Sequence, residues 1–327
     1  MKVVVGDANL LPHRVRFEAA LPPDASVHWL IGGDPEVLGD ALRDADVYVG
    51  GRFTAAMARA AEKLRLVHVA GAGTDRVEFA ALSSEVLVAN TFHHEQSIAE
   101  YAVAAAVMLR RDFLRQDRAL RAGVWATSVY DRSIPQPGTL RDARVGFVGF
   151  GHIGQRAWNL FRAFGSGGAA VTGSGRVDAA GYGLAWAGDI TRLDALLEES
   201  DVVLVSAPLT AATTGMIGAV QLRALGPGGV LINVGRGPLV DEQALYQALV
   251  SGGIRGAAID VWYSYPGPDG RGAPGALPFG QLSSALITPH SSGVTRDTFL
   301  GRVDDITANI GRLVRGEELR NVVAPPR

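Results

Sequence analysis

Short apolar runs rich in β-branched residues recur along the 327-residue chain, and stretches with helical spacing separate them. Strands that alternate with helices are typical of βαβ units and parallel sheets. The pattern therefore predicts the α/β class, with two doubly wound parallel-sheet domains. The first series of runs covers 3–5, 47–49, 66–69 and 86–89, and the second covers 145–148, 202–205, 230–233, 257–261 and 285–288.

Two helical patterns lie outside the strand series. Residues 97–120 combine an alanine-rich apolar face with a later Arg/Asp-rich stretch and predict one long connecting helix. After the last strand, Val303, Ile306 and Ile310 recur at helical spacing, with Gly316 as a stop signal. This second helix could return the chain to the first domain, which would make that domain discontinuous.

Residues 263–280 contain four Pro and five Gly and show no periodicity. A loop of this length inside a compact domain is often functional or mobile.

Composition and charge narrow the class of partner. The formal net charge of -2 gives no electrostatic footprint for nucleic acid or an anionic membrane. Cysteine is absent, which excludes disulfides and thiolate metal sites, and no HExxH or similar spacing suggests another metal. The N-terminal segment lacks the apolar core of a secretory signal, and no apolar stretch approaches the roughly 18 residues of a membrane span. We expect a cytoplasmic protein with a small-molecule partner.

A glycine-rich loop opens the second series. Gly149, Gly151 and Gly154 form GxGxxG between the strand-like run 144–148 and a helical pattern, and His152 and Ile153 fill the variable positions. In this context the first glycine allows a tight turn, the second admits a pyrophosphate, and the third lets helix and strand pack closely. The motif predicts a dinucleotide site; the alternative is a glycine-rich turn with no ligand.

The end of the next strand bears on the choice of dinucleotide. An acidic residue there would hold the ribose 2′-hydroxyl of NAD, but the sequence has Ser174, Gly175 and Arg176. A hydroxyl and a guanidinium suit a 2′-phosphate, so NADP(H) is favoured while NAD(H) stays possible. The alternative is that Arg176 points into solvent.

The later strands end in polar residues that should converge, because ligands lie at the carboxyl ends of strands in open α/β sheets. Arg236 follows one strand, Asp260 the next and His290 the last. Arg236 is a cation that can hold an anionic group, and His290 is a proton carrier near neutral pH. Alone, His290 would be read as a structural histidine at a strand end.

At these residues the sequence resembles the D-isomer-specific 2-hydroxyacid dehydrogenase family over nearly its whole length. The landmarks are Gly71-Ala-Gly73-Thr-Asp75, Ser97-Ile-Ala-Glu100, GFGHIG, Pro208-Leu-Thr210, NVGRGPLVDEQAL from Asn233, AAIDVW from Ala257 and Thr288-Pro-His290. The resemblance implies a flavodoxin-like substrate domain over 1–97 and 293–327, a Rossmann cofactor domain over 98–292, a hinged cleft and a homodimer.

The resemblance also implies roles for single residues. Arg236 would clamp the substrate carboxylate and polarise the carbonyl, and His290 would exchange the hydroxyl proton. The amides of Ala72 and Gly73 would bind the carboxylate, and Asp260 would orient the nicotinamide carboxamide. Further cofactor contacts are expected at Ala207, Pro208, Thr213, Val234, Gly235, Ser292 and Gly293.

One position departs from the family pattern. Where the family places a glutamate five residues after the aspartate, this chain has Tyr265. Without the carboxylate the protonated form of His290 loses a stabilising charge, so we expect an acid-shifted optimum for reduction. Tyr265 is a catalytic candidate that could offer its hydroxyl to His290 or to substrate, or its register could be an artefact of the Pro/Gly loop. The formate dehydrogenase branch also has a non-acidic residue there, namely glutamine.

Arg52 follows a strand end of the first series, and His94 precedes the Ser-Ile-Ala-Glu segment. Either could bind a second anionic group of the substrate, or both could be solvated loop residues.

The sequence thus predicts an NADP-dependent, D-specific reductase of small 2-oxo acids in the glyoxylate and hydroxypyruvate size range. Two alternatives stay open. One is a dehydrogenase of an unusual small anion such as formate or phosphite, and the other is a nucleotide-binding regulator with reduced catalysis.

Overall fold

The computed structural model describes residues 1–32, 35–267 and 269–324. The chain divides into two compact units, one formed by 1–93 with 295–324 and the other by His94–Val294. The sequence led us to expect divisions after residues 97 and 292. Of the predicted ranges, residues 33–34, 268 and 325–327 lie outside the described residues.

The first unit is built on a parallel sheet in which the described residues form five strands in the order β2-β1-β3-β4-β5. This order, 2-1-3-4-5, is that of flavodoxin-like folds. The strands are β1 (Lys2–Val5), β2 (Ser26–Trp29), β3 (Val47–Val49), β4 (Leu66–His68) and β5 (Leu87–Ala89). The helices are η1 (Ala8–His13), α1 (Arg14–Ala19), α2 (Pro35–Leu42), α3 (Ala55–Ala60), η2 (Phe79–Ala81) and α11 (Arg296–Arg315).

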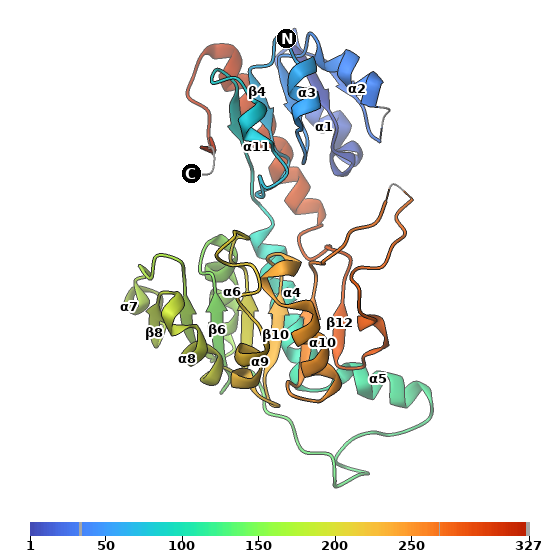
Figure 1. Cartoon of the computed structure of the whole chain (residues 1–327), viewed down its shortest axis with the longest axis vertical. Helices are drawn as coiled ribbons and strands as arrows, with labels where there is room; N and C mark the ends of the chain where they lie inside the picture. The colour runs from blue at the N-terminus through green and yellow to red at the C-terminus, as the bar shows by residue number, and fades with distance from the viewer. Residues whose placement is uncertain (33–34, 268, 325–327) are drawn as a thin grey trace. The chain divides into compact units, whose positions relative to one another are not determined.

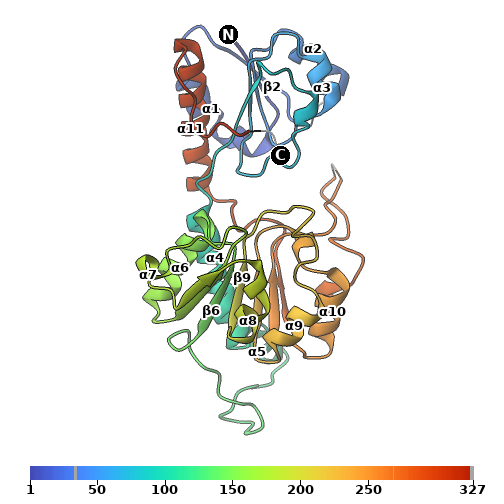
Figure 2. The same cartoon turned by 60° about the vertical axis from the view of Figure 1, so that its left-hand side comes forward.

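Alternate strand residues of this sheet face opposite layers of helices. Val3 and Val5 face α1 and α11, whereas Val4 packs with residues of α2 and α3 (Figures 1 and 2). Helix α11 contributes buried Val303 and Ile306 to the first of these layers. The chain therefore returns to the first unit after completing the second, and the first unit is discontinuous.

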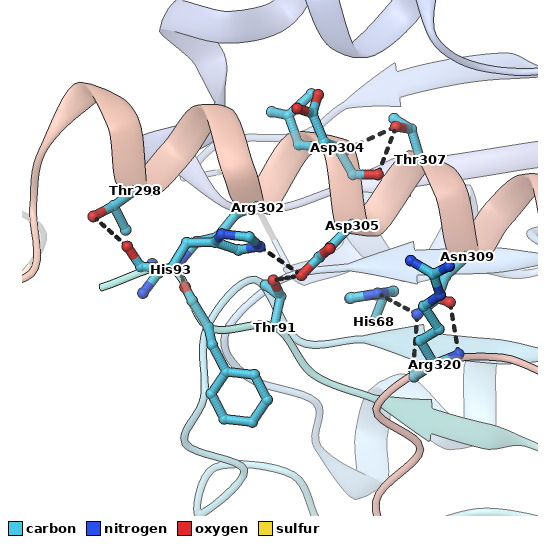
Figure 3. A network of polar contacts seen from close by, with 12 residues as sticks. His68, Thr91, His93, Thr298, Arg302, Asp304, Asp305, Thr307, Asn309 and Arg320 are labelled. Carbon is cyan, nitrogen blue, oxygen red and sulfur yellow. Dashed lines mark hydrogen bonds and ion pairs between the residues drawn. The ribbon is translucent and has the colours of Figure 1, made fainter. Parts of the chain in front are cut away.

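Polar residues of α11 hold the segment 91–93, where the chain leaves the sheet of the first unit (Figure 3). The Asp305 carboxylate accepts a hydrogen bond from the Thr91 hydroxyl at 2.7 Å and lies 2.8 Å from Nε2 of His93. Arg302 donates through Nε to a backbone carbonyl of the same segment at 3.1 Å. The C-terminal helix thus fixes this exit as well as covering the sheet.

The second unit is built on a larger parallel sheet, whose described strands run in the order β12-β11-β10-β9-β6-β7-β8. Read from β8, this is 3-2-1-4-5-6 with one further strand, the Rossmann order. The strands are β6 (Arg144–Val148), β7 (Gly167–Val171), β8 (Trp186–Gly188), β9 (Val202–Val205), β10 (Val230–Asn233), β11 (Gly256–Ile259) and β12 (Ala285–Ile287). The helices are α4 (Glu95–Arg110), α5 (Phe113–Arg121), α6 (His152–Ala163), α7 (Ala179–Tyr182), η3 (Ile190–Arg192), α8 (Leu193–Glu198), α9 (Ala219–Leu225), η4 (Gly237–Leu239), α10 (Glu242–Val250) and η5 (Phe279–Gln281).

Two apolar layers enclose this sheet. Val202 and Leu204 point to the layer of α4 and α6, and Val203 and Val205 point to the layer of α8, α9 and α10 (Figure 2). The predicted fold class, two doubly wound parallel sheets, is confirmed.

The predicted single helix over 97–120 is wrong, because α4 ends at Arg110 and α5 begins at Phe113. Asp112 between them has φ +60° and ψ 33°, a left-handed conformation through which a right-handed helix cannot continue. Aspartate tolerates this conformation better than most residues. The Pro/Gly-rich loop 263–280 has, among its described residues, no helix or strand before η5.

None of the helices in the described part of the chain is both long and apolar enough to cross a lipid bilayer.

His68 is fully buried beneath α11 (Figure 3). Its Nε2 lies 3.1 Å from the amide nitrogen of Asn309, which can only donate, and its Nδ1 lies 3.2 Å from the carbonyl oxygen of Val69, which can only accept. The ring therefore carries one proton, on Nδ1. Burial lowers the pKa of His68 to about 4, although the Val69 carbonyl and the Asp305 carboxylate act in the opposite direction.

This burial predicts a loss of stability in acid. Unfolding returns His68 to a pKa near 6.5, so the unfolded chain binds a proton that the native chain excludes between about pH 6.5 and pH 4. The unfolding free energy should fall across this window by about 3 kcal/mol and show no further contribution from this residue below it. Urea unfolding of wild type and His68→Gln from pH 7.5 to 4.5 measures the difference. The matched control is His28→Gln at an exposed position, which should keep the wild-type slope; equal slopes in wild type and His68→Gln would refute the assignment.

Candidate active site

The glycine-rich loop after β6 meets the steric demands of a dinucleotide turn. Gly149 has φ +91°, and a Cβ there would lie 2.7 Å from the backbone nitrogen of Ala207. A Cβ on Gly154 would lie 2.7 Å from the carbonyl oxygen of Gly149, whereas one on Gly151 would meet nothing within 4 Å. The first and third glycines thus serve close packing, and the second leaves open space in front of the backbone, where a pyrophosphate would lie.

The loop lies where the strand order of the second unit reverses, between β6 and β9. Gly151 is the N-cap of α6, which begins at His152. The Ser206 hydroxyl, just after β9, donates to the carbonyl oxygen of Gly149 at 3.1 Å and ties the two strand ends together. An exposed helix N-terminus at this switch point favours an anionic group.

Ser174, Gly175 and Arg176 form a turn beyond the end of β7. Gly175 has φ +65°, and the Ser174 hydroxyl accepts from the backbone N–H of Arg176 at 3.3 Å. Ser174 and Arg176 are exposed. Two carboxylates lie nearby and cap other turns: Asp178 accepts from Gly181 N–H at 2.9 Å, and Asp189 accepts from the hydroxyl and backbone N–H of Thr191 at 2.6 and 3.0 Å.

The segment after β9 is shaped by the hydroxyl of Thr213. It donates to the carbonyl oxygen of Pro208 at 2.8 Å and accepts from the backbone N–H of Thr210 at 2.8 Å. Ala207 is largely buried beside the glycine loop. Thr213 therefore fixes the backbone of this segment.

Arg236 follows β10 in a turn that Asn233 braces. The side-chain oxygen of Asn233 accepts from Gly235 N–H at 3.1 Å, and its amide nitrogen donates to the carbonyl oxygen of Arg236 at 3.0 Å. The Arg236 guanidinium donates to the carbonyl oxygen of Gly235 at 2.8 Å and is partly buried. Gly237 packs so closely on Trp262 that a Cβ would lie 2.4 Å from its carbonyl carbon. Val234 is buried in the same turn.

Asp260 follows β11, and none of its surface is exposed. One carboxylate oxygen accepts from the Thr288 hydroxyl at 2.6 Å and from Ser291 N–H at 2.8 Å. The other accepts from Ser292 N–H at 3.0 Å and from the Ser292 hydroxyl. Because a carboxylate offers about four acceptor positions, these four bonds account for them. Asp260 thus braces the turn 288–292; its expected contact with a nicotinamide carboxamide stays a prediction.

His290 lies in that turn, exposed and with φ +57°. Its Nδ1 is 3.0 Å from the hydroxyl oxygen of Tyr265, and the two ring centroids are 5.6 Å apart. The backbone N–H of Trp262 also donates to the Tyr265 hydroxyl, at 3.4 Å, and the Trp262 indole N–H donates to the carbonyl oxygen of Thr288 at 2.8 Å. The structure therefore brings Tyr265 to His290.

Another predicted residue of the second unit, His94, is the N-cap of α4. A Cβ on Gly293 would lie 3.2 Å from the Cβ of His94, so the first turn of α4 and the end of the 288–293 segment are neighbours. The binding of a ligand by either segment stays a prediction.

The first unit holds the remaining predicted residues. Arg52 is exposed after β3, at the reversal of strand order between β1 and β3, and lines a cavity of about 300 Å³ with Asp75, Arg76 and Glu78. Ala72 and Gly73 lie in the loop after β4. The Asn90 amide donates to the carbonyl oxygen of Ala72 at 2.8 Å and so fixes that loop.

The residues that brace the site were missed from the sequence. Asn233 has the signal of an Asx turn, since Asn directly before a Gly-containing turn often bonds its own backbone two residues on. Trp262 and Asn90 give no such signal, because their partners Tyr265, Thr288 and Ala72 become neighbours only in the fold. Among the described residues, no group of three or more His, Cys, Asp or Glu is placed to hold a metal ion.

Comparison with known proteins agrees with this geometry. Residues 103–292 match the family described as D-isomer specific 2-hydroxyacid dehydrogenase, NAD binding domain. That match covers more than half of the chain, and the chain belongs to the D-isomer specific 2-hydroxyacid dehydrogenase family.

Its relatives carry several names. The D-3-phosphoglycerate dehydrogenase of Mycobacterium leprae is 32% identical over 93% of this chain and 56% of that protein. The glycerate dehydrogenase of Methylorubrum extorquens is 28% identical over 95% of this chain and 92% of that protein. The NADPH-dependent glyoxylate/hydroxypyruvate reductase of Sinorhizobium meliloti, solved with NADP and malonate, has a TM-score of 0.78 and 26% identity, covering 99% of this chain and 96% of that one. The chain spans about half the length of the mycobacterial phosphoglycerate dehydrogenases that it matches.

The glycine loop generates a paired prediction. Gly151→Ala should leave the unfolding free energy within about 0.5 kcal/mol of wild type, because its methyl group enters open space. It should weaken NADPH and NADH binding by tenfold or more, because the same methyl occupies the approach to the pyrophosphate. Gly149→Ala, at φ +91° and against the Ala207 backbone, should instead cost about 1–3 kcal/mol of stability.

Thermal unfolding and fluorescence titration with each nucleotide separate the two effects. Gly167→Ala is the control for a methyl group added in open space elsewhere in the second unit, and should change neither property. Unchanged nucleotide affinity in Gly151→Ala would show that the loop does not bind pyrophosphate.

Proposed function

We propose that this chain is a cytoplasmic, NADP-dependent oxidoreductase that transfers a hydride between nicotinamide and a small 2-oxo or 2-hydroxy acid, with D specificity. The observation that carries the proposal is the common placement of Arg236, His290 and the glycine loop. All three follow the carboxyl ends of strands in one parallel sheet, where ligands of such sheets bind.

Arg236 and His290 have different roles toward the substrate. The Arg236 guanidinium is always charged and has donors in a fork that fits a carboxylate, so it holds the substrate and draws electron density from its carbonyl. His290 delivers a proton to the oxygen that becomes the hydroxyl, or removes it in the oxidative direction. The nicotinamide, when bound, supplies or accepts the hydride.

The other predicted positions complete the two binding regions. In the first unit, the substrate domain of this proposal, the amides of Ala72 and Gly73 bind the carboxylate. In the second, the cofactor domain, the pyrophosphate lies against Gly151, His152 and Ile153. The remaining cofactor contacts come from the strand-end segments at Ala207, Pro208, Thr213, Val234, Gly235, Ser292 and Gly293. Asp260, whose acceptor positions the 288–292 turn fills, contributes by positioning the last of these segments.

NADP is favoured over NAD by the turn after β7. Ser174 and Arg176 are exposed there, and the carboxylates of Asp178 and Asp189 are bonded to other turns. A guanidinium and a hydroxyl bind a 2′-phosphate that a carboxylate would repel. The similar reductase from Sinorhizobium meliloti was solved with NADP.

The substrate is a 2-oxo acid of the glyoxylate and hydroxypyruvate size. The named activity of that reductase supports this, as does the glycerate dehydrogenase relative. Arg52, at the strand reversal of its own sheet and on the wall of a cavity, is placed for a second anionic group, and His94 is a further candidate.

The second unit also carries the surface of a homodimer in this proposal. A groove of about 500 Å³ runs between α4, α5 and α6, lined by Val103, Ala104, Val107, Met108, Phe113, Leu160 and Phe164, with Glu100 at its edge. The chain between α5 and β6 leaves the body of the unit (Figure 1) and exposes 57% of Val124, 61% of Trp125, 79% of Val129 and 70% of Tyr130. This exposed apolar segment and the apolar groove lie on the same chain. A two-fold interface could bury both, because each copy would contribute the same surfaces to it.

The catalytic proposal is tested by oxidation of NADPH, with NADH in parallel, against glyoxylate, hydroxypyruvate, pyruvate, oxaloacetate and bulkier 2-oxo acids. We expect turnover of the small acids with NADPH preferred. Arg236→Gln should lower kcat/KM by about 100-fold or more and leave the Kd for NADPH unchanged, because it removes a charge at the reacting carbonyl but not at the nucleotide. Turnover of formate or phosphite alone would replace the proposed substrate with the small-anion alternative. Tight NADPH binding without any turnover would favour the regulator.

The dimer is tested by Ala104→Arg, which places a charge on an exposed position of the groove. Sedimentation should show wild type as a dimer and this variant as a monomer with an unchanged circular dichroism spectrum. Val220→Arg, on exposed α9, is the control and should sediment as wild type does. A monomeric wild type would refute the interface.

A further inference from the structure

Tyr265 and His290 form a pair whose hydrogen-bond direction can be worked out. The Tyr265 hydroxyl oxygen lies 3.0 Å from Nδ1 of His290, and Tyr265 is 39% exposed. The planes of the two rings are inclined by 46°. The contact is therefore made edge-on through the hydroxyl and not by ring stacking.

The geometry favours the phenol as the donor in this contact. The backbone N–H of Trp262 donates to the Tyr265 oxygen at 3.4 Å, a long bond that nevertheless points a donor at the acceptor side of that oxygen. The phenol has a single proton of its own, and Nδ1 of His290 is a nitrogen acceptor within reach. A phenol that accepts from Trp262 and donates to Nδ1 satisfies all three groups.

This direction decides the tautomer of neutral His290. An imidazole that accepts at Nδ1 carries its proton on Nε2. A carboxylate in place of Tyr265 would act oppositely, since it can only accept and would place the proton on Nδ1. Tyr265 thus keeps the proton of neutral His290 on Nε2, the ring nitrogen that does not face the phenol.

We propose that Tyr265 is a positioning residue that holds neutral His290 as the Nε2–H tautomer and supplies it with a second proton. His290 then protonates the substrate oxygen without first becoming an imidazolium. The proposal rests on the reductase function proposed above.

A bound dihydronicotinamide would supply a hydride, with two electrons, to the carbonyl carbon of the 2-oxo acid, so the nucleotide would be oxidised and the acid reduced. The C=O π bond becomes a lone pair on oxygen, and this alkoxide takes the proton from Nε2 of His290. Nδ1 takes the phenolic proton of Tyr265, and the resulting phenolate recovers a proton from water at the exposed edge of the ring.

Hydrogen bonds from neighbouring residues hold the segments that carry Tyr265 and His290 in place. Asp260 accepts from the N–H of Ser291, next to His290, and the Trp262 indole bonds the carbonyl oxygen of Thr288 on its other side. Within the described part of the second unit, several charged or titratable groups lie on the elements around His290. Tyr265 and Asp260 follow β11, Arg236 follows β10, and α4 with its N-cap brings His94, Glu95 and Tyr101. The Arg236 guanidinium donates to the Gly235 carbonyl, and Asp260 is fully bonded to the turn.

This pairing changes the pH dependence expected from the sequence alone. With only an isolated imidazolium as donor, the reductive rate falls about tenfold per pH unit above the usual titration of histidine near 6.5. With the Tyr265 hydroxyl donating to Nδ1, the neutral pair can still protonate the substrate oxygen, so the reductive rate is sustained above neutral pH. The acid-shifted optimum for reduction that the sequence led us to expect is therefore predicted only for a variant that lacks the Tyr265 hydroxyl.

The first experiment compares reductive kcat/KM of wild type and Tyr265→Phe from pH 5.5 to 9. Wild type should vary by less than about threefold, and Tyr265→Phe should match it at pH 5.5 but fall about 100-fold below it at pH 8.5. Tyr263→Phe is the matched control, because it removes a hydroxyl from the same loop that bonds the Val240 carbonyl at 3.0 Å, and it should keep the wild-type profile. Parallel profiles for wild type and Tyr265→Phe, or a wild type that declines tenfold per unit above pH 7, would overturn the proposal.

The second experiment needs no turnover, and so separates this proposal from the proposed function. Histidine ¹⁵N spectra at pH 8 report which ring nitrogen carries the proton, and His290→Asn identifies the His290 signals, since Asn tolerates the positive φ. Wild type should show the proton on Nε2 and Tyr265→Phe a mixture of tautomers. The same tautomer in both chains would overturn the positioning role even if the enzyme is active, and the expected difference would support that role even if no 2-oxo acid is reduced.

Discussion

The buried carboxylate of Asp260 is the constraint on which the arrangement of the second unit's strand ends depends. A carboxylate that is removed from water is tolerated only if its acceptor positions are filled, and here donors of the 288–292 turn fill them. The turn cannot shift without leaving a buried charge unsatisfied. His290, which lies in that turn with φ +57°, is held in a conformation that it would not adopt unaided.

Close backbone approaches impose the same order on the neighbouring strand ends. Gly237 lies against the Trp262 carbonyl, and Gly149 lies against the Ala207 amide, at distances that no side chain would allow. Each contact joins the residues after one strand to those after another. Backbone packing and buried hydrogen bonds therefore position Arg236 and Tyr265, and contacts at the ends of their own side chains do not.

The sequence predicts the inner strands well, and it predicts the edge strands and the residues that support the site poorly. Runs such as 202–205 and 230–233 are strands because they are β-branched or leucine-rich and buried on both faces, which is a local signal. The edge strands β2 and β8 lack it: β2 alternates exposed and half-buried residues, and β8 is Trp-Ala-Gly, so pairing with a neighbour makes them strands. The break between α4 and α5 at Asp112 also gives no signal in the sequence, because a single left-handed residue leaves the helical spacing on either side intact. Among the site residues, strand ends and glycine spacing predict where Arg236 and His290 lie, but the bond from Tyr265 to His290 depends on how a long loop folds back.

The return of α11 to the first sheet has a consequence during synthesis. The five strands of that sheet are complete once residue 89 has been made, yet the helix that buries Val3, Val5 and Val47 on one face ends at Arg315. At roughly 5–20 residues per second, the ribosome needs on the order of 10 to 40 s to reach it. Throughout that interval a nascent chain carries an apolar sheet face that η1 and α1 cover only in part, and the second unit, whose residues are contiguous, is completed before the first.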